Sequence, residues 1–198
     1  MRILGVDASF ARTGFAILTL PTDPWVPGTE TAIVGALATT KRPGQDDDAV
    51  RIDAIAKATV RWAQDHQVDL VCIEQPWCGR NYSVGMRLQA LVATVADRCR
   101  QAGYEVLTVY PAEASAAMGV SSKLKRPQRK AAMQRALLTR YGIASDHDDE
   151  ADAVGVALGG YIKRRDLQRQ AAREAERPRL PGLEGYKPRK RGKKRARR

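Results

Sequence analysis

Hydrophobic residues follow two patterns along this chain: short apolar runs, and longer segments in which apolar positions recur at helical spacing. Short runs bounded by turn residues predict strands over residues 2–7, 15–20, 31–39, 69–74 and 105–110. Helical spacing and helix-start signals predict helices over residues 49–66, 84–103, 111–118, from 127 onward, and from 149 to about 176. Three strands therefore precede the first helix, and strands then alternate with helices. This order predicts an α/β fold whose sheet is part antiparallel and part parallel.

Two of the predicted strands end on a carboxylate. The run Arg2–Asp7 closes on Asp7, and the run DLVCIE closes on Glu74. Open α/β sheets place their ligands at the carboxyl ends of parallel strands, so we expect both side chains at one edge of the sheet. Residues 9–14 are expected to form the turn of an early hairpin.

A third acidic element begins the last predicted helix. Asp149 and Asp152 are three residues apart, so they share a helix face about one turn long. Asp148 and Glu150 make this helix start more acidic than one cap requires, and the sequence leaves open whether Asp148 or Asp149 is the partner of Asp152. If the helix begins beside the two strand ends, four carboxylates converge.

Converging carboxylates repel one another unless a cation compensates them. Oxygen ligands without a cluster of His or Cys suit a hard ion such as Mg²⁺ or Mn²⁺. Two such ions, about 4 Å apart, can activate a water molecule and stabilise the leaving oxygen of a phosphodiester. The competing interpretation is that these acids are unrelated turn and cap residues.

The net charge of +12 is unevenly distributed and suggests a polyanionic partner. Lys187–Arg198 holds nine basic residues and no acid, so the other 186 residues carry a net charge of only +3. We therefore predict a folded domain over residues 1–177, which carries the acidic elements, and a flexible basic tail over residues 178–198. The three cysteines lack paired metal spacing, and no apolar run approaches 18 residues, so we expect reduced thiols, a cytoplasmic location and no membrane partner.

The segments GVDASFARTG, CIEQPW and DDEADAVGVAL resemble the three acidic motifs of RuvC-type Holliday junction resolvases, in the ribonuclease H-like superfamily. The resemblance covers about residues 1–162 in the right order and at the right separations. It implies a mixed five-stranded sheet flanked by helices, and a divalent-metal-dependent endonuclease that cuts branched DNA, above all four-way junctions. It also implies catalytic and metal-binding roles for Asp7, Glu74, Asp149 and Asp152.

The resemblance further implies DNA-contacting residues. Trp77 holds the place of an aromatic that wedges against unstacked bases in the family, although a Trp packed in the core is an equal alternative. Lys130 matches a lysine that would neutralise phosphate. With the basic residues of the loops and tail, the predicted DNA-contacting set is Trp77, Arg80, Lys123, Lys125, Arg126, Lys130, Lys190 and Arg191.

Three features depart from the family pattern. Ala8-Ser9 replaces the usual Pro-Gly, the uncharged Ser115 stands near the place of a basic residue, and the loop Gly119–Lys130 is longer and more basic. These differences leave the DNA-contact surface and the cutting preference open, and they indicate a divergent member of the family.

The predicted helix 84–103 has a wide apolar face, made of Met86, Leu88, Leu91, Val92 and Val95. Symmetric cutting of a four-way junction needs two active sites, so we predict a homodimer in which one side of this helix meets its symmetry mate. Alternatively, other helices of the same chain cover both sides.

Two other functions compete with junction resolution. A nuclease of the same fold could prefer flaps, forks or RNA-containing duplexes, since its metal site would be the same. A non-catalytic nucleic-acid-binding protein would use the basic tail alone. An ATP-binding actin-like fold would need a second glycine-rich phosphate loop, which the sequence lacks.

Overall fold

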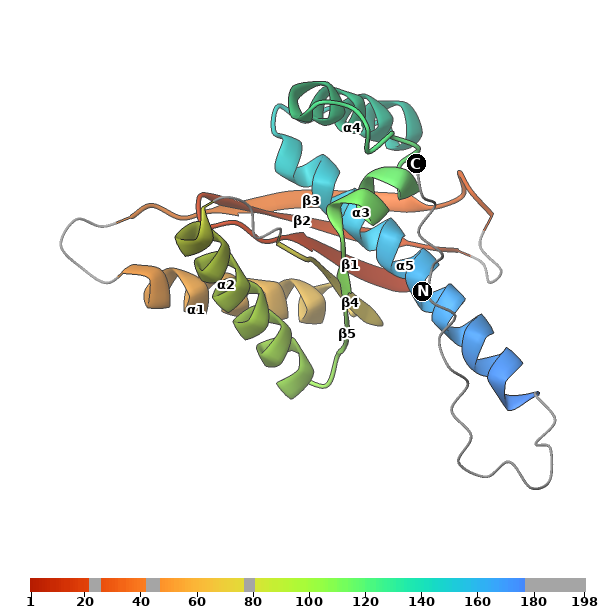
Figure 1. Ribbon diagram of the computed structural model, residues 1–198, viewed down its shortest axis with the longest axis horizontal. Coiled ribbons are helices and arrows are strands. Elements are labelled where there is room, and N and C mark those ends of the chain that lie inside the picture. Colours follow the sequence, from red (N-terminus) through yellow and green to blue (C-terminus); the bar gives the residue numbers. More distant parts are fainter. Residues whose placement is uncertain (22–25, 42–46, 77–80, 177–198) are drawn as a thin grey trace, which may run out of the picture. The chain divides into compact units, whose positions relative to one another are not determined.

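The computed structural model describes residues 1–21, 26–41, 47–76 and 81–176. Its five strands form one sheet in the order β3-β2-β1-β4-β5 (Figure 1). Strand β1 pairs antiparallel with β2 and parallel with β4, β2 pairs antiparallel with β3, and β4 pairs parallel with β5. The strands are β1 (Arg2–Asp7), β2 (Arg12–Thr19), β3 (Thr31–Ala38), β4 (Leu70–Glu74) and β5 (Glu105–Val109). This topology confirms the predicted mixed sheet.

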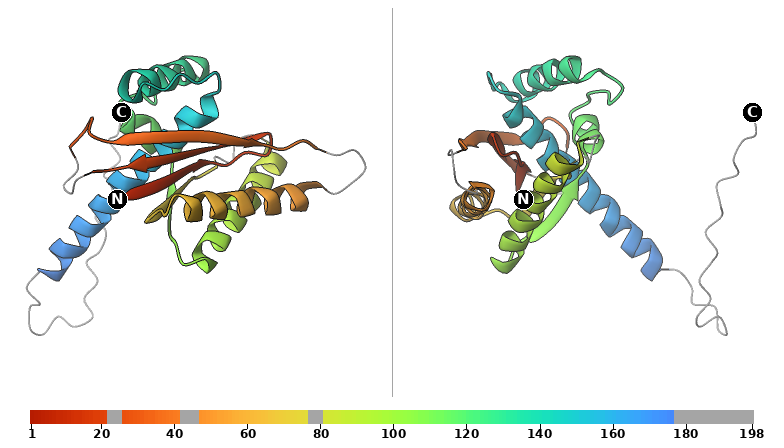
Figure 2. Two further views of the ribbon diagram at one scale, coloured as in Figure 1. Left: turned by 180° about the vertical axis from the view of Figure 1, so that it is seen from behind. Right: turned by 60° about the vertical axis from the view of Figure 1, so that its left-hand side comes forward.

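Helices cover both faces of the sheet. Figures 1 and 2 show α1 and α2 on one face and α3, α4 and the first part of α5 on the other. The helices are α1 (Asp47–Asp65), α2 (Tyr82–Gln101), α3 (Pro111–Ala117), α4 (Arg126–Tyr141) and α5 (Asp148–Ala175). Each predicted helix is present, with starts that differ by two residues or fewer.

One strand differs more from the prediction. Strand β2 begins at Arg12 rather than at residue 15, so the hairpin turn is shorter than expected. Side chains hold this turn: the Thr13 hydroxyl donates to the carbonyl of Ser9 at 2.8 Å, and the Ser9 hydroxyl donates to the carbonyl of Arg12 at 3.0 Å. Thr13 is fully buried, and its hydroxyl has the hydrogen-bond partner that a buried polar group needs.

The alternation of side chains along β1 and β4 builds two separate cores. Ile3 and Leu70 face the cluster that includes α5, whereas Leu4 and Val71 face the cluster that includes α1 and α2. Successive residues of a strand point to opposite faces, so each strand is apolar on both sides. This explains why both runs are apolar at nearly every position.

Helix α5 packs very close to the sheet because small residues line the contact. A Cβ atom at Gly5 would lie 2.1 Å from the carbonyl oxygen of Ala153. A Cβ atom at Gly160 would lie 2.0 Å from the sulfur of Cys72, and one at Gly14 would lie 2.2 Å from the carbonyl oxygen of Asp149. These glycines fix the height of α5 over β1, β2 and β4, and the contact at Gly14 places the start of α5 beside β2.

A buried carboxylate anchors the end of α4. Glu30, whose side chain is fully buried, forms an ion pair with Arg140 and accepts a hydrogen bond from the Tyr141 hydroxyl at 3.1 Å. Arg140 also donates to the carbonyl of Ala117 at 3.4 Å. These contacts tie the last turn of α4 to the segment before β3 and to the end of α3.

The wide apolar face of α2 is mostly covered within the chain. Leu91, Val92 and Val95 are buried in the cluster shared with α1 and the sheet. Leu88 is half-buried, and Met86 is 49% exposed. These three residues form the side of α2 that packs within the chain, which both interpretations of this helix expect, and the dimer contact stays a prediction.

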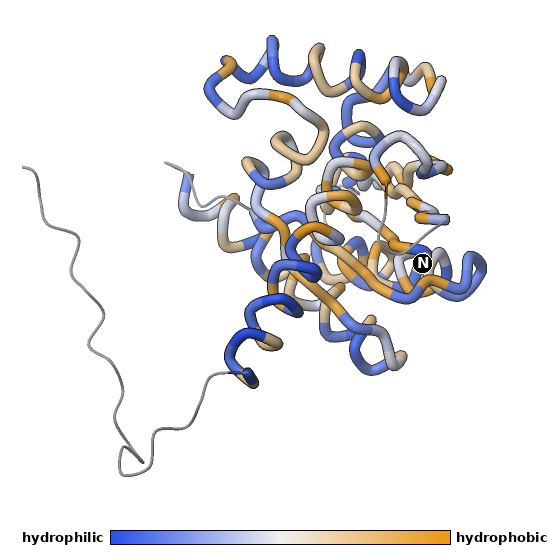
Figure 3. Tube along the Cα trace, turned by 90° about the vertical axis from the view of Figure 1, so that its right-hand side faces the viewer, coloured by the Kyte–Doolittle hydropathy of each residue, from blue (hydrophilic) through white to orange (hydrophobic). Residues whose placement is uncertain are grey.

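The chain divides into two compact units, residues 1–165 and 166–198, and α5 runs from the first into the second. Within the second unit the structure describes residues 166–176, which are mostly hydrophilic (Figure 3). None of the described helices is long and apolar enough to cross a membrane.

Candidate active site

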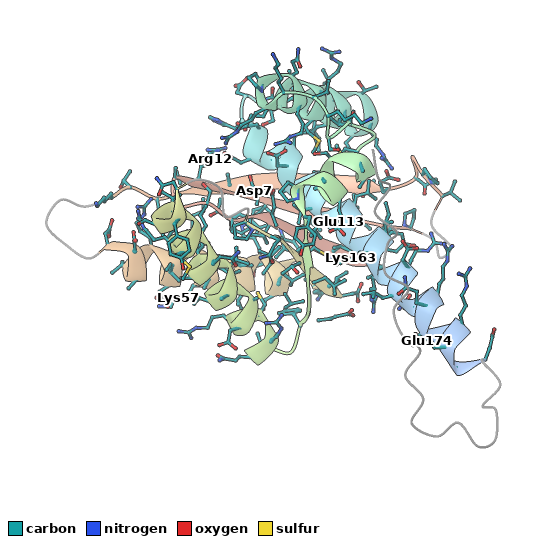
Figure 4. The ribbon with its side chains drawn as sticks, viewed as in Figure 1. Asp7, Arg12, Lys57, Glu113, Lys163 and Glu174 are labelled. Carbon is teal, nitrogen blue, oxygen red and sulfur yellow. The ribbon has the colours of Figure 1, made fainter. Side chains whose placement is uncertain are left out.

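The carboxyl ends of β1 and β4 bring Asp7 and Glu74 together. The last paired residues of these parallel strands are Val6 and Ile73, so the two acids follow side by side at the same edge of the sheet. Val6 and Ile73 face α1 and α2, and strand alternation therefore directs Asp7 and Glu74 to the opposite face, toward α5. Figure 4 labels Asp7 in this region.

The start of α5 supplies the other two carboxylates. Asp149 and Asp152, one turn apart, line a pocket of about 550 Å³ together with Asp7 and Glu74. The structure thus brings together all four residues that the sequence indicated as candidate metal ligands. They come from three elements that are distant in sequence, and the close packing of α5 on the sheet places them at one site.

The four acids strongly affect one another electrostatically. Burial raises the pKa of Asp7 well above its usual range, and the charges of the three neighbouring carboxylates raise it further. Burial, with the charge of Asp152, raises the pKa of Glu74 to about 7. Burial also raises the pKa of Asp152, against the opposing charge of Lys130. The negative charges of its three neighbours therefore oppose the ionisation of Asp7.

Basic residues from the first turns of α4 line the same pocket. Arg126, Arg129 and Lys130 all lie on its wall. The spacing of these residues, three and four apart, places them on one face of a helix. Arg126 and Lys130 belong to the DNA-contacting set predicted from the sequence, whereas Arg129 is a basic residue of the pocket that this set did not contain.

Two further acids at the start of α5 do not line the pocket, and each makes an ion pair. Asp148 pairs with Lys130, while Glu150 pairs with Arg12 of β2, with 3.0 Å between Nη2 and Oε1. Asp149 lines the pocket and Asp148 does not appear in its wall. This arrangement favours Asp149 over Asp148 as the partner of Asp152, a choice that the sequence had left open.

The other predicted site residues lie elsewhere. Lys123 and Lys125 are exposed, in the segment between α3 and α4, and are not in the pocket wall. The departures from the family motif do reach the site: Ala8, Ser9 and Ser115 line the pocket, and the Ser115 hydroxyl donates to the carbonyl of residue 111 at 2.8 Å. Four predicted DNA-contacting residues lie outside the described residues, namely Trp77, Arg80, Lys190 and Arg191.

The chemistry of the pocket fits a divalent cation. The four carboxylates offer only oxygen donors, and their negative charges would be stabilised by a hard positive ion. Within the described residues, no group of three or more His, Cys, Asp or Glu side chains is arranged to hold an ion as it stands. Side-chain rotation would thus have to complete a coordination shell.

A ribonuclease H-like sheet with acids at two central strand ends and at a helix start defines the class as a nuclease. Residues 3–159 match the family described as "Crossover junction endodeoxyribonuclease RuvC". The chain belongs to this family of metal-dependent nucleases, and it is an endodeoxyribonuclease of the Holliday junction resolvase type. The family and the enzyme class predicted from the motifs are thereby confirmed.

Comparisons with individual proteins agree with this family. The chain is 26% identical over 175 residues to the crossover junction endodeoxyribonuclease RuvC of Rhodococcus jostii (strain RHA1), covering 88% of each chain. Among solved structures, it resembles RuvC of T. thermophilus in complex with a Holliday junction substrate, with a TM-score of 0.65, 15% identity, and coverage of 84% of this chain and 96% of that one. A complex of the Fowlpox virus resolvase with Holliday junction DNA gives a TM-score of 0.54 at 14% identity, covering 83% and 99% of the two chains. These likenesses confirm the fold.

Proposed function

We propose that this chain resolves four-way DNA junctions by metal-dependent phosphodiester hydrolysis, with Asp7, Glu74, Asp149 and Asp152 as the metal ligands. The observation that supports this most is the convergence of these four acids in one pocket whose wall also carries three basic side chains. The carboxylates would hold Mg²⁺ or Mn²⁺, as two ions in each site. The basic side chains would hold the phosphates of the substrate.

Bound metal ions would supply Lewis-acid stabilisation of the phosphodiester and an activated water molecule. The residues of the chain perform the remaining tasks. Arg129 and Lys130, on one face of α4, contact the backbone phosphate and orient the scissile bond. Ser115 is uncharged although it stands near the place of a basic residue in the family. Arg129, which lines the same pocket, would supply the missing positive charge. The ion pair with Asp148 holds the Lys130 side chain in the pocket wall.

A panel of substrates tests this proposal against the related nucleases. The protein is incubated with Mg²⁺ and equal concentrations of a four-way junction, a flap, a fork, an RNA–DNA duplex and a linear duplex, with EDTA in parallel. We expect the junction to be cut fastest and EDTA to stop cutting. Faster cutting of flaps, forks or the RNA–DNA duplex would instead assign the pocket to one of those substrates.

A homodimer is part of the proposal, and the exposed apolar residues of α2 are the candidate contact. Tyr82 and Met86 are 72% and 49% exposed and lie one turn apart on α2, so they share a face of this helix. Resolution of a junction needs two sites related by two-fold symmetry, and a self-complementary contact of this face would supply them.

We expect Met86→Glu to convert the dimer into a monomer, because a charge placed in an apolar contact must be desolvated. Light scattering would report the mass, and labelled strands would show whether nicks remain paired. Leu138→Glu, at a residue of α4 that is 52% exposed, is the matched control and should leave the dimer intact. An unchanged mass in Met86→Glu would place the contact elsewhere, whereas a wild-type monomer that cuts single strands would contradict the dimer.

The remaining DNA contacts also stay proposals. Trp77, three residues after Glu74, would stack on an unpaired base at the junction centre, where stacking contributes about 1–3 kcal/mol. Arg80, in the same segment, would contact phosphate, as would Lys190 and Arg191 in the basic C-terminal segment. Lys123 and Lys125 are exposed and would reach DNA outside the pocket.

Deleting Lys187–Arg198 should weaken the binding of linear and branched DNA alike, because this segment carries nine basic residues and no acid. For each phosphate that is no longer neutralised, the slope of log affinity against log salt becomes shallower by roughly 0.9. Binding titrations at several salt concentrations would measure that slope for both DNAs. A loss of affinity confined to the junction would show instead that the segment recognises branch structure.

A further inference from the structure

We infer that Glu150 is a positioning residue: by holding Arg12 in the shorter of its two ion pairs, it limits the contact of this arginine with Asp149 and so keeps Asp149 available to a cation. The inference rests on the proposed role of Asp149 as a metal ligand. It concerns the one cation in the described structure that contacts both a pocket carboxylate and an acid outside the pocket wall.

Arg12 lies between two carboxylates and is closer to Glu150. Its Nη2 donates a hydrogen bond to Oε1 of Glu150 at 3.0 Å, whereas its Nε is 3.4 Å from Oδ2 of Asp149 and forms an ion pair only. Figure 4 labels Arg12, which begins the strand next to the one that ends in Asp7. The side chains of Arg12, Asp149 and Glu150 are 29%, 22% and 15% exposed, so solvent screens these charges only in part.

Contacts on both sides hold this arrangement in place. Oε2 of Glu150 lies 2.6 Å from the Ser145 hydroxyl, which is also 2.7 Å from the carbonyl oxygen of His147 and can donate to either, while Oε1 accepts from Arg12. The backbone of Arg12 is fixed in the hairpin turn, where its N–H donates to the Ser9 hydroxyl at 3.2 Å. The guanidinium is thus within reach of both carboxylates, and its ion pair with Glu150 is the shorter one.

Removal of the charge of Glu150 would leave Asp149 as the ionised partner of Arg12. A guanidinium bound fully to Asp149 competes with a divalent cation for the same oxygens. Glu150→Gln should therefore weaken Mn²⁺ binding by about fivefold or more, the effect that a unit charge about 4 Å away has even in water. Glu150→Asp keeps the charge and should bind Mn²⁺ like the wild type.

A double-mutant cycle separates this role from two simpler ones. If Glu150 acts by controlling Arg12, Glu150→Gln weakens Mn²⁺ binding strongly in the wild-type background but by less than about twofold in the Arg12→Gln background. If Glu150 acts only through its own negative charge, the factor is the same in both backgrounds. If the pair only holds α5 in place, Arg12→Gln alone also weakens Mn²⁺ binding and lowers the melting temperature.

The experiment measures Mn²⁺ binding to the full-length protein without DNA, from the electron paramagnetic resonance signal of free Mn²⁺. The variants are Glu150→Gln, Arg12→Gln, their combination, Glu150→Asp and Asp149→Asn, each checked by thermal unfolding. The background-dependent factor supports the inference, and equal factors or a loss in Arg12→Gln overturn it. Asp149→Asn serves as the independent control: if it binds Mn²⁺ as the wild type does, the proposed metal site itself fails, and the inference fails with it.

Discussion

We expect Asp7→Asn to slow junction cleavage by roughly a thousandfold or more while junction binding survives. Asp7 ends the central strand β1 and shares the pocket with the other three carboxylates, and burial together with their charges raises its pKa. Loss of this ligand would remove metal-ion stabilisation of the transition state, which contributes several kcal/mol, and each 1.36 kcal/mol is a factor of ten in rate. Binding should persist because the substitution removes a negative charge that repels the DNA backbone.

Single-turnover cleavage and gel-shift binding of the same labelled junction would measure the two effects. The matched control is Asp97→Asn, in an exposed residue of α2 whose carboxylate accepts a hydrogen bond from Gln101 at 2.7 Å, outside the pocket wall. This variant should cut at the wild-type rate. Cleavage by Asp7→Asn at a rate near that of Asp97→Asn would remove Asp7 from the metal site.

The second large effect concerns the fold that assembles the site. Gly5→Ala should lower the free energy of unfolding by about 3 kcal/mol, at the upper end of the usual cost of overpacking. The added Cβ would lie 2.1 Å from the carbonyl oxygen of Ala153 and 2.7 Å from the backbone nitrogen of Ala157, and neither backbone atom can move without displacing α5. Urea unfolding measures the change, and cleavage should fall as well because α5 carries two of the carboxylates.

Gly142→Ala is the control for this prediction. Gly142 ends α4 with a positive φ of 69°, and a Cβ there would contact nothing within 4 Å. The cost should be only the strain of a left-handed residue, about 1 kcal/mol. If Gly5→Ala were no more destabilising than this control, α5 would be free to shift over the sheet, and the contact would not define the site.

The sequence predicted the parts of the site that depend on local pattern. The apolar runs ending at Asp7 and Glu74 indicated strand ends, and strand periodicity is enough to place both acids on one face of a parallel pair. The spacing of Asp149 and Asp152 indicated a shared helix face in the same way. The start of α5 could be placed beside these strands only through the family resemblance, because no local pattern encodes a packing partner.

Local sequence patterns could not predict contacts between residues that are far apart in the chain. Arg12 and Glu150 are separated by 138 positions, so nothing in the hairpin predicts their ion pair. The role of α2 shows the same limit, since Leu91 and Val95 are covered by the chain's own sheet and α1 although their spacing would equally suit a subunit contact.

Arg129 could have been found from its spacing with Arg126 and Lys130, but only once the face of α4 that meets the site was known.

The most direct test of junction resolution follows a single preformed complex of the protein with a four-way junction. Protein is bound to a labelled four-way junction in EDTA, excess Mg²⁺ is added, and the strands are separated by length. We expect each junction to become two nicked duplexes, with cuts at symmetric positions in two strands of like polarity. A junction that stays bound and uncut after both Mg²⁺ and Mn²⁺ have been supplied would contradict this expectation, and would show a branched-DNA-binding protein without nuclease activity.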